Sequence, residues 1–555
     1  MARNNARDNE PMKGWVIDGL SIKGDQLMSR YFSAKLVVAV SVSACLYAVL
    51  MHASAQPSDQ PWYGVPLPPA FQAHQIPAIV GNRGPAPAVV PAGEEQYNEL
   101  RGERLLRDLH AIIAFSHQSR EQQELGGDQM WGRVAGFPSG TASAEWAAQQ
   151  FRDAGIEQVT IQSFDQDEDA SLWLPVEWEV RLLGDSLAQP GSDDVVLTTA
   201  VALAPSQITD GMLEAPLIYV GTARPAELTH MDVRGKIAIQ HITPQAHLVF
   251  ERSAAVPRAQ DLMARGAVAV INIIDQPGNE MARDLANCGG PCFNIGGRDG
   301  VFLTRVLDAA ANHGHDGQLR ARLSLEANQH SQLTGQNVIA VIPGTSTETI
   351  VLNAHLDAWY DGAGDNGDGV AVMMALARHF SRPDIELNRT LVLVASAGHH
   401  TTGLNGPRNA VLMNPTLFDS SVLIFNLEHV AQRNFSPARS VLPDGYREFI
   451  ADSGEAPIVA GITNESGFLQ DLFDQGVQRY GTNFVSGNST MASGEGGGYR
   501  EAGVPIVTTM QAPPLYHTSG EVADAISVPG MERMARFMAW FVKQVDHASH
   551  SDINP

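Results

Sequence analysis

The chain has 555 residues, of which 44% are hydrophobic and 18% are charged. This composition is typical of a globular protein, and the length requires at least two packed units. The formal net charge of -24 argues against nucleic acid or an anionic membrane surface as a partner, because either would need a basic surface.

Residues 1–55 have the features of a signal peptide. The apolar run Leu36–Met51 follows basic residues and leads into Ala53-Ser54-Ala55, a small-x-small cleavage pattern. We expect a mature chain that begins near Gln56, is secreted or periplasmic, and has no stable membrane partner after cleavage. A retained anchor is the alternative, although the run is shorter than the about 20 apolar residues that a span needs. Lipoprotein cleavage at Cys45 is a further alternative.

The predicted elements follow in chain order. Residues 56–95 are rich in proline and indicate an extended linker or surface strap. Next come helices at 94–116 and 142–154, strands at 158–164, 176–183, 216–221 and 233–240, a helix at 259–266 and a strand at 267–274. After Thr334 we expect strands at 350–353, 390–396, 421–426 and 504–509, with helices at 369–380 and 531–545. This alternation predicts a doubly wound α/β fold.

Two cysteines remain after removal of the signal peptide, Cys288 and Cys292 in the segment NCGGPCF. An even pair in an exported protein predicts a local disulfide. A Cys-x3-Cys metal site is the alternative, but the sequence offers neither a second cysteine pair nor a nearby histidine to complete a tetrahedron.

The stretch Asn353–Ala371, NAHLDAWYDGAGDNGDGVA, is predicted to contain half of the ligands of a metal site. The preceding apolar run places His355 and Asp357 at a strand end, where the binding and catalytic residues of open α/β sheets lie. His355 offers an imidazole, and Asp357 is suited to orient it. Asp365 lies in a glycine-rich loop and can reach the same ion, because glycines allow a close approach of the backbone.

Glu428 and His517 also follow apolar, strand-like runs. With NVIAVIPG, the H-x-D, the GAGDN loop, NRTLVLVASAG, FNLE, AGVPIV and YHTSGE, the sequence resembles the co-catalytic di-zinc exopeptidases, the family of secreted bacterial aminopeptidases and glutamate carboxypeptidase. VRGKIAI and ARGAVAVINI resemble the protease-associated domain often inserted in these enzymes. The resemblance implies an α/β fold with a mixed, mostly parallel sheet, helices on both faces and a smaller inserted domain.

The expected domain boundaries combine these observations. They are a signal peptide at 1–55, a linker at 56–95, the first part of the catalytic domain at 96–205, a protease-associated insert at 206–330, the second part of the catalytic domain at 331–548 and a tail at 549–555.

The resemblance also implies two zinc ions. His355, Asp365 and Glu428 would hold one, and Asp365 would bridge to a second that His517 also binds. Two cations this close would polarise a peptide carbonyl and lower the pKa of a water molecule toward neutrality. Tyr516 matches a family tyrosine that can donate a hydrogen bond to the tetrahedral oxyanion.

The sequence departs from the family at its paired glutamates. Alignment without a gap places His400 and Thr401 there, whereas a one-residue gap places His399 and His400 there. In the first register His400 replaces the general base, and a neutral imidazole can accept a proton. Thr401 is then a poor substitute for a carboxylate ligand. A second departure is GEGGGY at 494–499, where the family has Ser-Asp-His near the substrate pocket.

We therefore expect an exported, metal-dependent aminopeptidase that acts on peptides. The alternative is a non-catalytic metal- or peptide-binding protein of the same fold, because both glutamates are replaced. A serine hydrolase is disfavoured because the sequence has no G-x-S-x-G motif, and the H-E-x-x-H motif of other zinc enzymes is also absent. The sequence predicts neither the oligomeric state nor the preferred side chain of the substrate.

Overall fold

The structure is a computed structural model that describes residues 60–555, apart from 82, 126–128, 188, 190, 244–251, 284–286, 438–445, 491 and 512–513. The predicted signal peptide and residues 56–59 of the predicted linker lie outside the described residues. Within the described ranges, no helix combines the length and the apolar character needed to cross a membrane.

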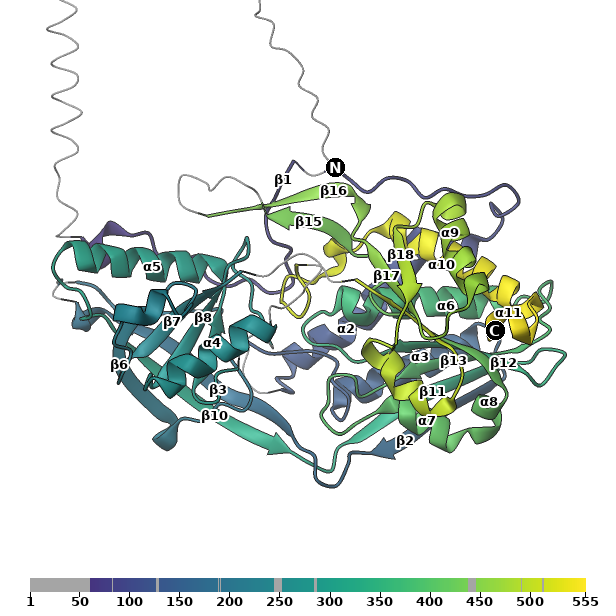
Figure 1. Ribbon diagram of the computed structural model, residues 1–555, viewed down its shortest axis with the longest axis horizontal. Helices are drawn as coiled ribbons and strands as arrows, with labels where there is room; N and C mark the ends of the chain where they lie inside the picture. The colour runs from purple at the N-terminus through teal and green to yellow at the C-terminus, as the bar shows by residue number, and fades with distance from the viewer. Residues whose placement is uncertain are drawn as a thin grey trace, which may run out of the picture. The chain divides into compact units, whose positions relative to one another are not determined.

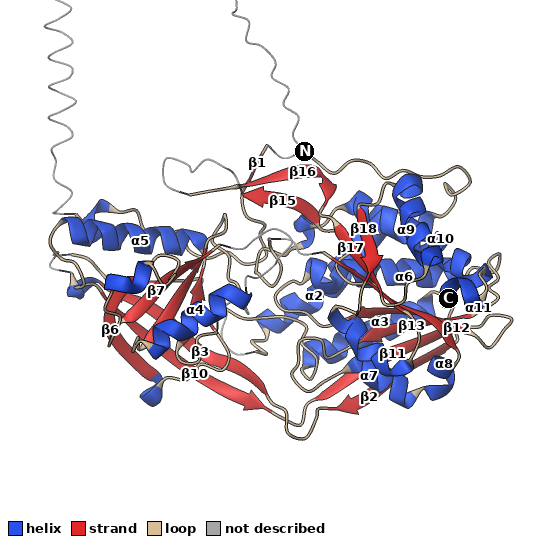
Figure 2. Ribbon diagram, in the orientation of Figure 1, coloured by secondary structure: helices blue, strands red, loops and turns tan. Residues whose placement is uncertain are grey.

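The main sheet has eight strands in the order β18-β17-β19-β14-β12-β13-β11-β2 (Figures 1 and 2). Its strands are β2 (Gln158–Asp165), β11 (Thr334–Ile342), β12 (Thr349–His355), β13 (Thr390–Ser396), β14 (Ser421–Asn426), β17 (Ile458–Ile462), β18 (Phe484–Asn488) and β19 (Ile506–Met510). The central strands β13, β12, β14 and β19 pair in parallel, and β11 and β2 extend the sheet antiparallel. The predicted mixed α/β sheet is confirmed.

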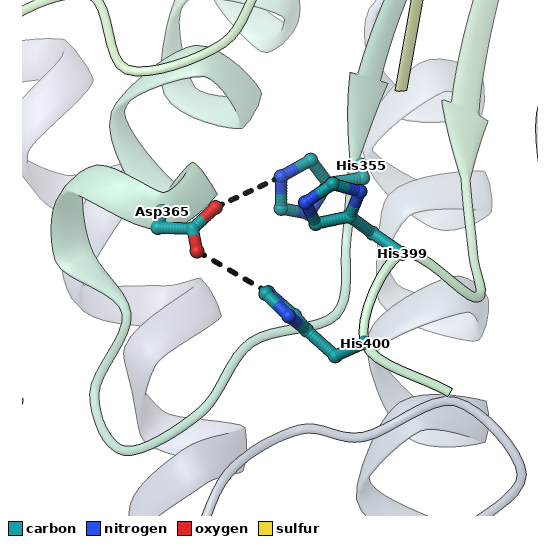
Figure 3. A group of neighbouring side chains, drawn as sticks. All are labelled: His355, Asp365, His399 and His400. Carbon is teal, nitrogen blue, oxygen red and sulfur yellow. Dashed lines mark ion pairs between the residues drawn. The ribbon is translucent and has the colours of Figure 1, made fainter. Parts of the chain in front are cut away.

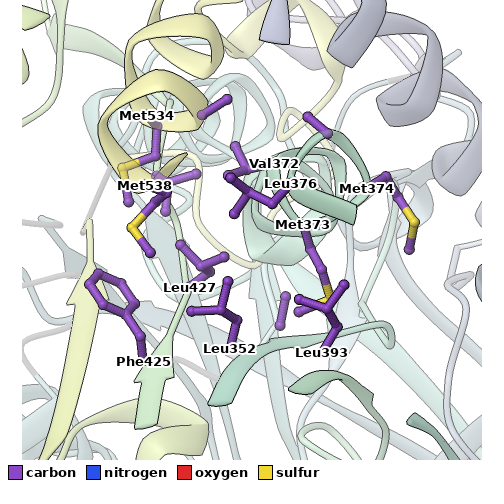
Figure 4. Packing of buried hydrophobic residues seen from close by; sticks show 14 of the residues in the cluster. Leu352, Val372, Met373, Met374, Leu376, Leu393, Phe425, Leu427, Met534 and Met538 are labelled. Atoms are coloured by element: carbon purple, nitrogen blue, oxygen red, sulfur yellow. The ribbon is translucent and has the colours of Figure 1, made fainter. Parts of the chain in front are cut away.

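Both faces of this sheet are covered at its centre, so β12, β13 and β14 are buried along almost their whole length, whereas the edge strand β2 has exposed residues. Leu352, Leu393 and Phe425 pack toward α6 and α10, as Figure 4 shows. Val351 and Val392 point to the opposite face, toward α7 and α8. Full burial of one such side chain contributes about 1.5–3 kcal/mol to stability. The helices are α2 (Gly102–Glu121), α3 (Pro138–Asp153), α6 (Asp368–Phe380), α7 (Gly406–Met413), α8 (Pro415–Asp419), α9 (Gly467–Tyr480), α10 (Val528–His547) and α11 (His550–Ile553).

A second sheet has the order β4-β3-β10-β6-β7-β8-β9-β5. It contains β3 (Leu172–Leu183), β4 (Val195–Val196), β5 (Val201–Ala202), β6 (Met212–Tyr219), β7 (Ile237–Ile242), β8 (Ala269–Ile274), β9 (Cys292–Ile295) and β10 (Arg320–His330), with helices α4 (Arg252–Ala264) and α5 (Gly297–Asn312). β3 and β10 pair antiparallel from Leu183 opposite Arg320 to Leu172 opposite His330. The expected boundary at residue 206 therefore falls inside this sheet, after β3.

Cys288 and Cys292 are both buried thiols, so the predicted disulfide is wrong for this structure. The Cys288 thiol donates to the backbone oxygens of Gly290 and Pro291, at 3.5 and 3.4 Å. Asn272 donates to the Cys292 sulfur at 3.8 Å. Burial, together with the neighbouring Cys288 thiol, raises the pKa of Cys292 well above its ordinary value. A thiol with a raised pKa forms little of the thiolate that disulfide formation requires.

The proline-rich segment is a strap whose described part is hydrogen-bonded to the rest of the chain. Its short strand β1 (Ile79–Val80) pairs in parallel with β16 (Phe449–Glu455), which pairs in turn with β15 (Arg433–Pro437). Further along, the Ala86 N–H donates to the Ser453 oxygen at 2.7 Å. Residues 60–95, which we call the strap, are thus held in place by backbone hydrogen bonds.

A segment between strands β8 and β9 of the second sheet contacts the loop that carries His517. Ala282 forms an isolated antiparallel bridge with Thr518, and the Arg283 N–H donates to the His517 oxygen at 3.1 Å. Beside this bridge, the Ser519 hydroxyl donates to Glu280 at 2.9 Å. The conformation of the His517 loop therefore depends on this segment between β8 and β9.

Glu280 predicts a pH dependence of stability at this contact. Burial raises the pKa of this carboxyl to about 7. The hydrogen bond from Ser519 lowers the pKa but offsets only part of the effect of burial. The folded protein therefore keeps a proton that the unfolded chain releases near pH 4.5, and stability falls as the pH rises from there to about 7. Because the side chain retains some contact with solvent, we expect a loss of about 2 kcal/mol.

Glu280→Gln removes this titration. The variant is expected to be more stable than the wild type at pH 8, and the difference should vanish near pH 4, as measured by urea denaturation at both pH values. Glu326→Gln, at an exposed position of β10, is the matched control. An equal response of Glu280→Gln and Glu326→Gln to pH would contradict the prediction.

Candidate active site

The site lies at the carboxyl ends of the parallel strands, where open α/β sheets bind their ligands. Each strand end supplies part of it: His355 ends β12, His399 and His400 follow β13, Glu428 and His429 follow β14, and His517 follows β19. Asp365 comes from the loop between β12 and α6. The structure thus brings the four predicted ligands together with three further histidines.

The carboxylate of Asp365 is the centre of this cluster. Its Oδ1 lies 3.0 Å from Nε2 of His355 and 2.9 Å from Nε2 of His429. Its Oδ2 lies 2.8 Å from Nε2 of His517 and 3.3 Å from Nε2 of His400. Figure 3 shows the His355 and His400 rings directed at different oxygens of this carboxylate. One carboxylate therefore faces two separate sets of imidazoles.

The donor atoms of this cluster fit a metal centre. Nε2 of His355 and Nε2 of His400 are buried and, among the residues that the structure describes, have no hydrogen-bond partner of normal geometry. Burial lowers the pKa of His355, but the close approach and the negative charge of the Asp365 carboxylate outweigh it and raise the pKa to about 10. The same two opposing causes raise the pKa of His429 to about 9. A metal cation can take the place of these protons, because it is favoured by the same carboxylate.

Glu428 lies beside the Oδ1 half of the cluster. Its Oε2 accepts hydrogen bonds from Asn426 Nδ2 at 2.7 Å and from the Glu495 N–H at 3.1 Å. Its Oε1 points inward, 3.9 Å from Nε2 of His399 and 4.0 Å from Nε2 of His429. One oxygen is thus fixed by neighbours, which leaves the other available as a ligand.

The position of Glu428 requires glycine at residue 494. A Cβ on Gly494 would lie 2.1 Å from Oε2 of Glu428, and φ is +53° at this residue. We expect Gly494→Ala to displace the carboxylate, lower kcat/KM at least about tenfold and reduce stability by about 1–3 kcal/mol. Kinetics and thermal unfolding measure the two effects.

Gly497→Ala, in the same loop, is the matched control for Gly494→Ala. A Cβ on Gly497 would have only an ordinary contact, 3.5 Å from the Ala492 oxygen. Equal kinetics for Gly494→Ala and Gly497→Ala would show that the position of Glu428 is unimportant.

Asp357 was expected to orient His355, and the structure places Asp357 next to His355 and to the loop of His399 and His400. Nδ1 of His355 is 2.9 Å from the backbone oxygen of Asp357 and 3.7 Å from its carboxylate Oδ1. The carboxylate instead accepts the backbone N–H groups of His399 at 3.3 Å and His400 at 2.9 Å. Asp357 therefore holds the loop that carries both histidines.

That loop sends its three side chains in different directions. The Thr401 hydroxyl donates to the Ala135 oxygen at 2.8 Å. The His399 ring stacks on His355 at 4.4 Å between centroids, and its side chain is 20% exposed where it borders the cleft. Burial and the neighbouring His355 and His400 hold the pKa of His399 well below its ordinary value. Burial also lowers the pKa of His400.

An open cleft of about 720 Å³ leads to the cluster. Tyr516 lies on its wall, with its ring stacked on His517 at 3.8 Å between centroids. Trp173 of the second sheet and Arg283 of its connections also line the cleft. The Arg283 guanidinium lies 3.3 Å from the ring centroid of Trp359. The cleft therefore combines aromatic surface with one cationic side chain next to the cluster.

Sequence reasoning missed two residues of the cluster. His429 directly follows Glu428, so its adjacency to an expected ligand was the available signal. Glu495 lies in the GEGGGY segment, where the departure from the family was noticed but not interpreted. Glu495 accepts hydrogen bonds from Asn353 Nδ2 at 3.1 Å and from the Ser396 hydroxyl, and burial raises its pKa to about 8.

The fold and this histidine–carboxylate centre define a metallopeptidase-type hydrolase. Residues 337–542 match the sequence profile of peptidase family M28. This match supports a relationship of this part of the chain to the co-catalytic zinc exopeptidases. A search of curated protein sequences gives no significant match.

Solved structures of similar fold cover most of the chain. BSAP, a zinc aminopeptidase from Bacillus subtilis, is 19% identical, with a TM-score of 0.54 over 82% of this chain and 98% of that one. A peptidase M28 precursor from Shewanella amazonensis SB2B is 18% identical, with a TM-score of 0.54 over 81% of this chain and 98% of that one. At this level of identity the likeness establishes the fold.

Proposed function

We propose that the protein is an exported zinc aminopeptidase that hydrolyses the N-terminal bond of peptides. The observation that carries this proposal is the carboxylate of Asp365, whose two oxygens face two different sets of imidazoles. The match of residues 337–542 to peptidase family M28 supports the peptidase chemistry, and the zinc aminopeptidase of similar fold supports the choice of metal and of reaction. Export is supported by the features of residues 1–55.

The distances support one set of ligands for each of two metal ions. His355, Glu428 and His429 surround the Oδ1 side of Asp365, and their ligand atoms lie within 4.8 Å of one another. His400 and His517 face Oδ2. In this assignment His400 is a metal ligand and not the general base, which corresponds to the alignment with a one-residue gap.

His399 is then the general base. It borders the cleft, and its lowered pKa keeps the imidazole neutral, so that it can accept a proton from a water molecule. Two bound cations would polarise the peptide carbonyl and acidify the attacking water. Tyr516 borders the same cleft and can donate a hydrogen bond to the oxyanion. Asp357 positions the chain at His399 through the backbone N–H.

Metal analysis of the purified mature protein, combined with kinetics, tests the proposal. We expect at least two zinc ions per chain, two of them at the active site, and hydrolysis of aminoacyl anilides and dipeptides. Acetylation of the substrate α-amine should abolish turnover, because an aminopeptidase requires the free amine. Bound metal without hydrolysis of any substrate between about pH 5 and 9, where a histidine base titrates, would instead support the non-catalytic binding protein. Equal turnover of acetylated substrates would contradict the aminopeptidase assignment.

A further inference from the structure

A second group of metal-binding side chains lies outside the candidate active site. It consists of His74 from the strap, His117 from α2 and Asp361 from the loop between β12 and Asp365. These three residues are far apart in the sequence, and no pattern of spacing connects them. Their ligand atoms nevertheless lie within 4.8 Å of one another.

The carboxylate of Asp361 joins the two imidazoles. Its Oδ1 is 2.7 Å from Nδ1 of His74, and its Oδ2 is 3.0 Å from Nε2 of His117. Trp131 Nε1 donates to Oδ1 at 3.0 Å and so fixes the orientation of the carboxylate. Such a hydrogen bond to a coordinating carboxylate is a common supporting contact in metal sites.

The exposure of the three side chains suits a metal ion that also binds water. The Asp361 side chain is only 3% exposed, whereas those of His74 and His117 are 28% and 39% exposed. The ion would therefore have three protein ligands on one side and solvent on the other. Burial alone would raise the pKa of Asp361, but His117 and His74 lower it to about 2, so the carboxylate is ionised at neutral pH.

Charged groups surround the two imidazole rings. The His74 and His117 rings lie 3.8 Å apart between centroids and share the carboxylate of Asp361. Arg120 lies over the Trp131 ring at 5.0 Å, and Arg133 donates to the backbone oxygen of Asp361 at 2.6 Å. A cation bound between the two rings would be attracted by the Asp361 carboxylate and repelled by these two arginines.

We propose that His74, His117 and Asp361 form a separate zinc-binding site that fastens the strap to the loop leading to Asp365. Two imidazoles and one carboxylate, with water in the fourth position, are a ligand set that zinc accepts. The loop is also held by Arg133, which donates to the backbone oxygens of Leu356 at 2.6 Å and Gly362 at 2.9 Å. Zinc at this site therefore stabilises the chain between His355 and Asp365 without touching either.

Zinc titration of the full mature protein tests this site, with the number of bound ions and the unfolding temperature as readouts. His117→Ala and His74→Ala should each bind one zinc ion fewer per chain than the wild type. Each should also lose the rise in unfolding temperature that zinc produces at this site. His110→Ala, at an exposed position of the same helix as His117, is the matched control and should bind as many ions as the wild type.

The Asp365→Asn background separates this site from the active site. There we expect one zinc ion to remain, and the addition of His117→Ala should remove it. Unchanged zinc stoichiometry in both His117→Ala and His74→Ala would overturn the proposal, as would the absence of bound zinc in Asp365→Asn. Because the readout is metal content, a failure of the proposed peptidase activity would leave this result unaffected.

Discussion

Asp365→Asn is expected to lower kcat/KM by at least about a thousandfold and to remove both active-site zinc ions together. Its carboxylate faces His355 and His429 with one oxygen and His400 and His517 with the other. An amide is neutral and offers only one good acceptor atom, so neither ion keeps its shared anionic ligand. A thousandfold loss corresponds to about 4 kcal/mol of transition-state stabilisation, which is reasonable for the loss of metal catalysis.

The matched control is Asp384→Asn, because Asp384 is a surface residue paired with Arg382. It should leave both turnover and active-site metal content unchanged. Metal analysis and kinetics must be measured on the same preparations, so that loss of metal and loss of rate are compared directly. Loss of only one active-site ion from Asp365→Asn would show that the carboxylate does not bridge two metals.

The sequence predicted the centre of the fold well because burial leaves a simple pattern. Strands covered on both faces are continuous apolar runs, and the polar residue that follows such a run lies at the sheet's carboxyl edge. His355, Glu428 and His517 were found in this way, and Asp365 by its glycine-rich loop. The structure brings these four residues together at that edge.

Features that depend on long-range contacts were not predictable in the same way. β3 belongs to the second sheet because it pairs with β10, which follows it by more than a hundred residues, and periodicity carries no information about partners. The disulfide prediction rested on an even pair of cysteines in an exported chain, yet the Cys288 thiol donates to nearby backbone oxygens. The convergence of His74 and His117 on Asp361 left no signal in the sequence at all.

The sequence favoured the alignment without a gap, with His400 as the general base, because the other alignment needs an insertion. A one-residue gap in a loop changes no hydrophobic pattern that could correct this choice. The backbone resolves the geometry by turning Thr401 toward the Ala135 oxygen and directing His400 at Asp365. His399 is left at the edge of the cleft, stacked on His355. The roles of His399 and His400 can therefore be tested separately by substitution.

His400→Ala and His399→Ala are expected to impair the enzyme in different ways. His400→Ala should lose one of the two active-site zinc ions, because it removes a buried imidazole that faces Asp365 Oδ2 at 3.3 Å. His399→Ala should keep both ions and lose about 10²–10⁴-fold in kcat, the usual contribution of a general base. Thr401→Ala should behave like the wild type in both respects, because the Thr401 hydroxyl is engaged by the Ala135 oxygen.

The pH profile separates a base from a residue that only shapes the cleft. Burial and neighbouring histidines lower the pKa of His399, so the wild-type acid limb should lie below pH 6.5, since activity is lost only when the imidazole is protonated. His399→Glu should recover part of the lost kcat, because a carboxylate can also accept the proton. The base assignment is wrong if His399→Ala retains wild-type kcat, or if it also loses zinc. Loss of zinc from Thr401→Ala with retention in His400→Ala would favour the alignment without a gap.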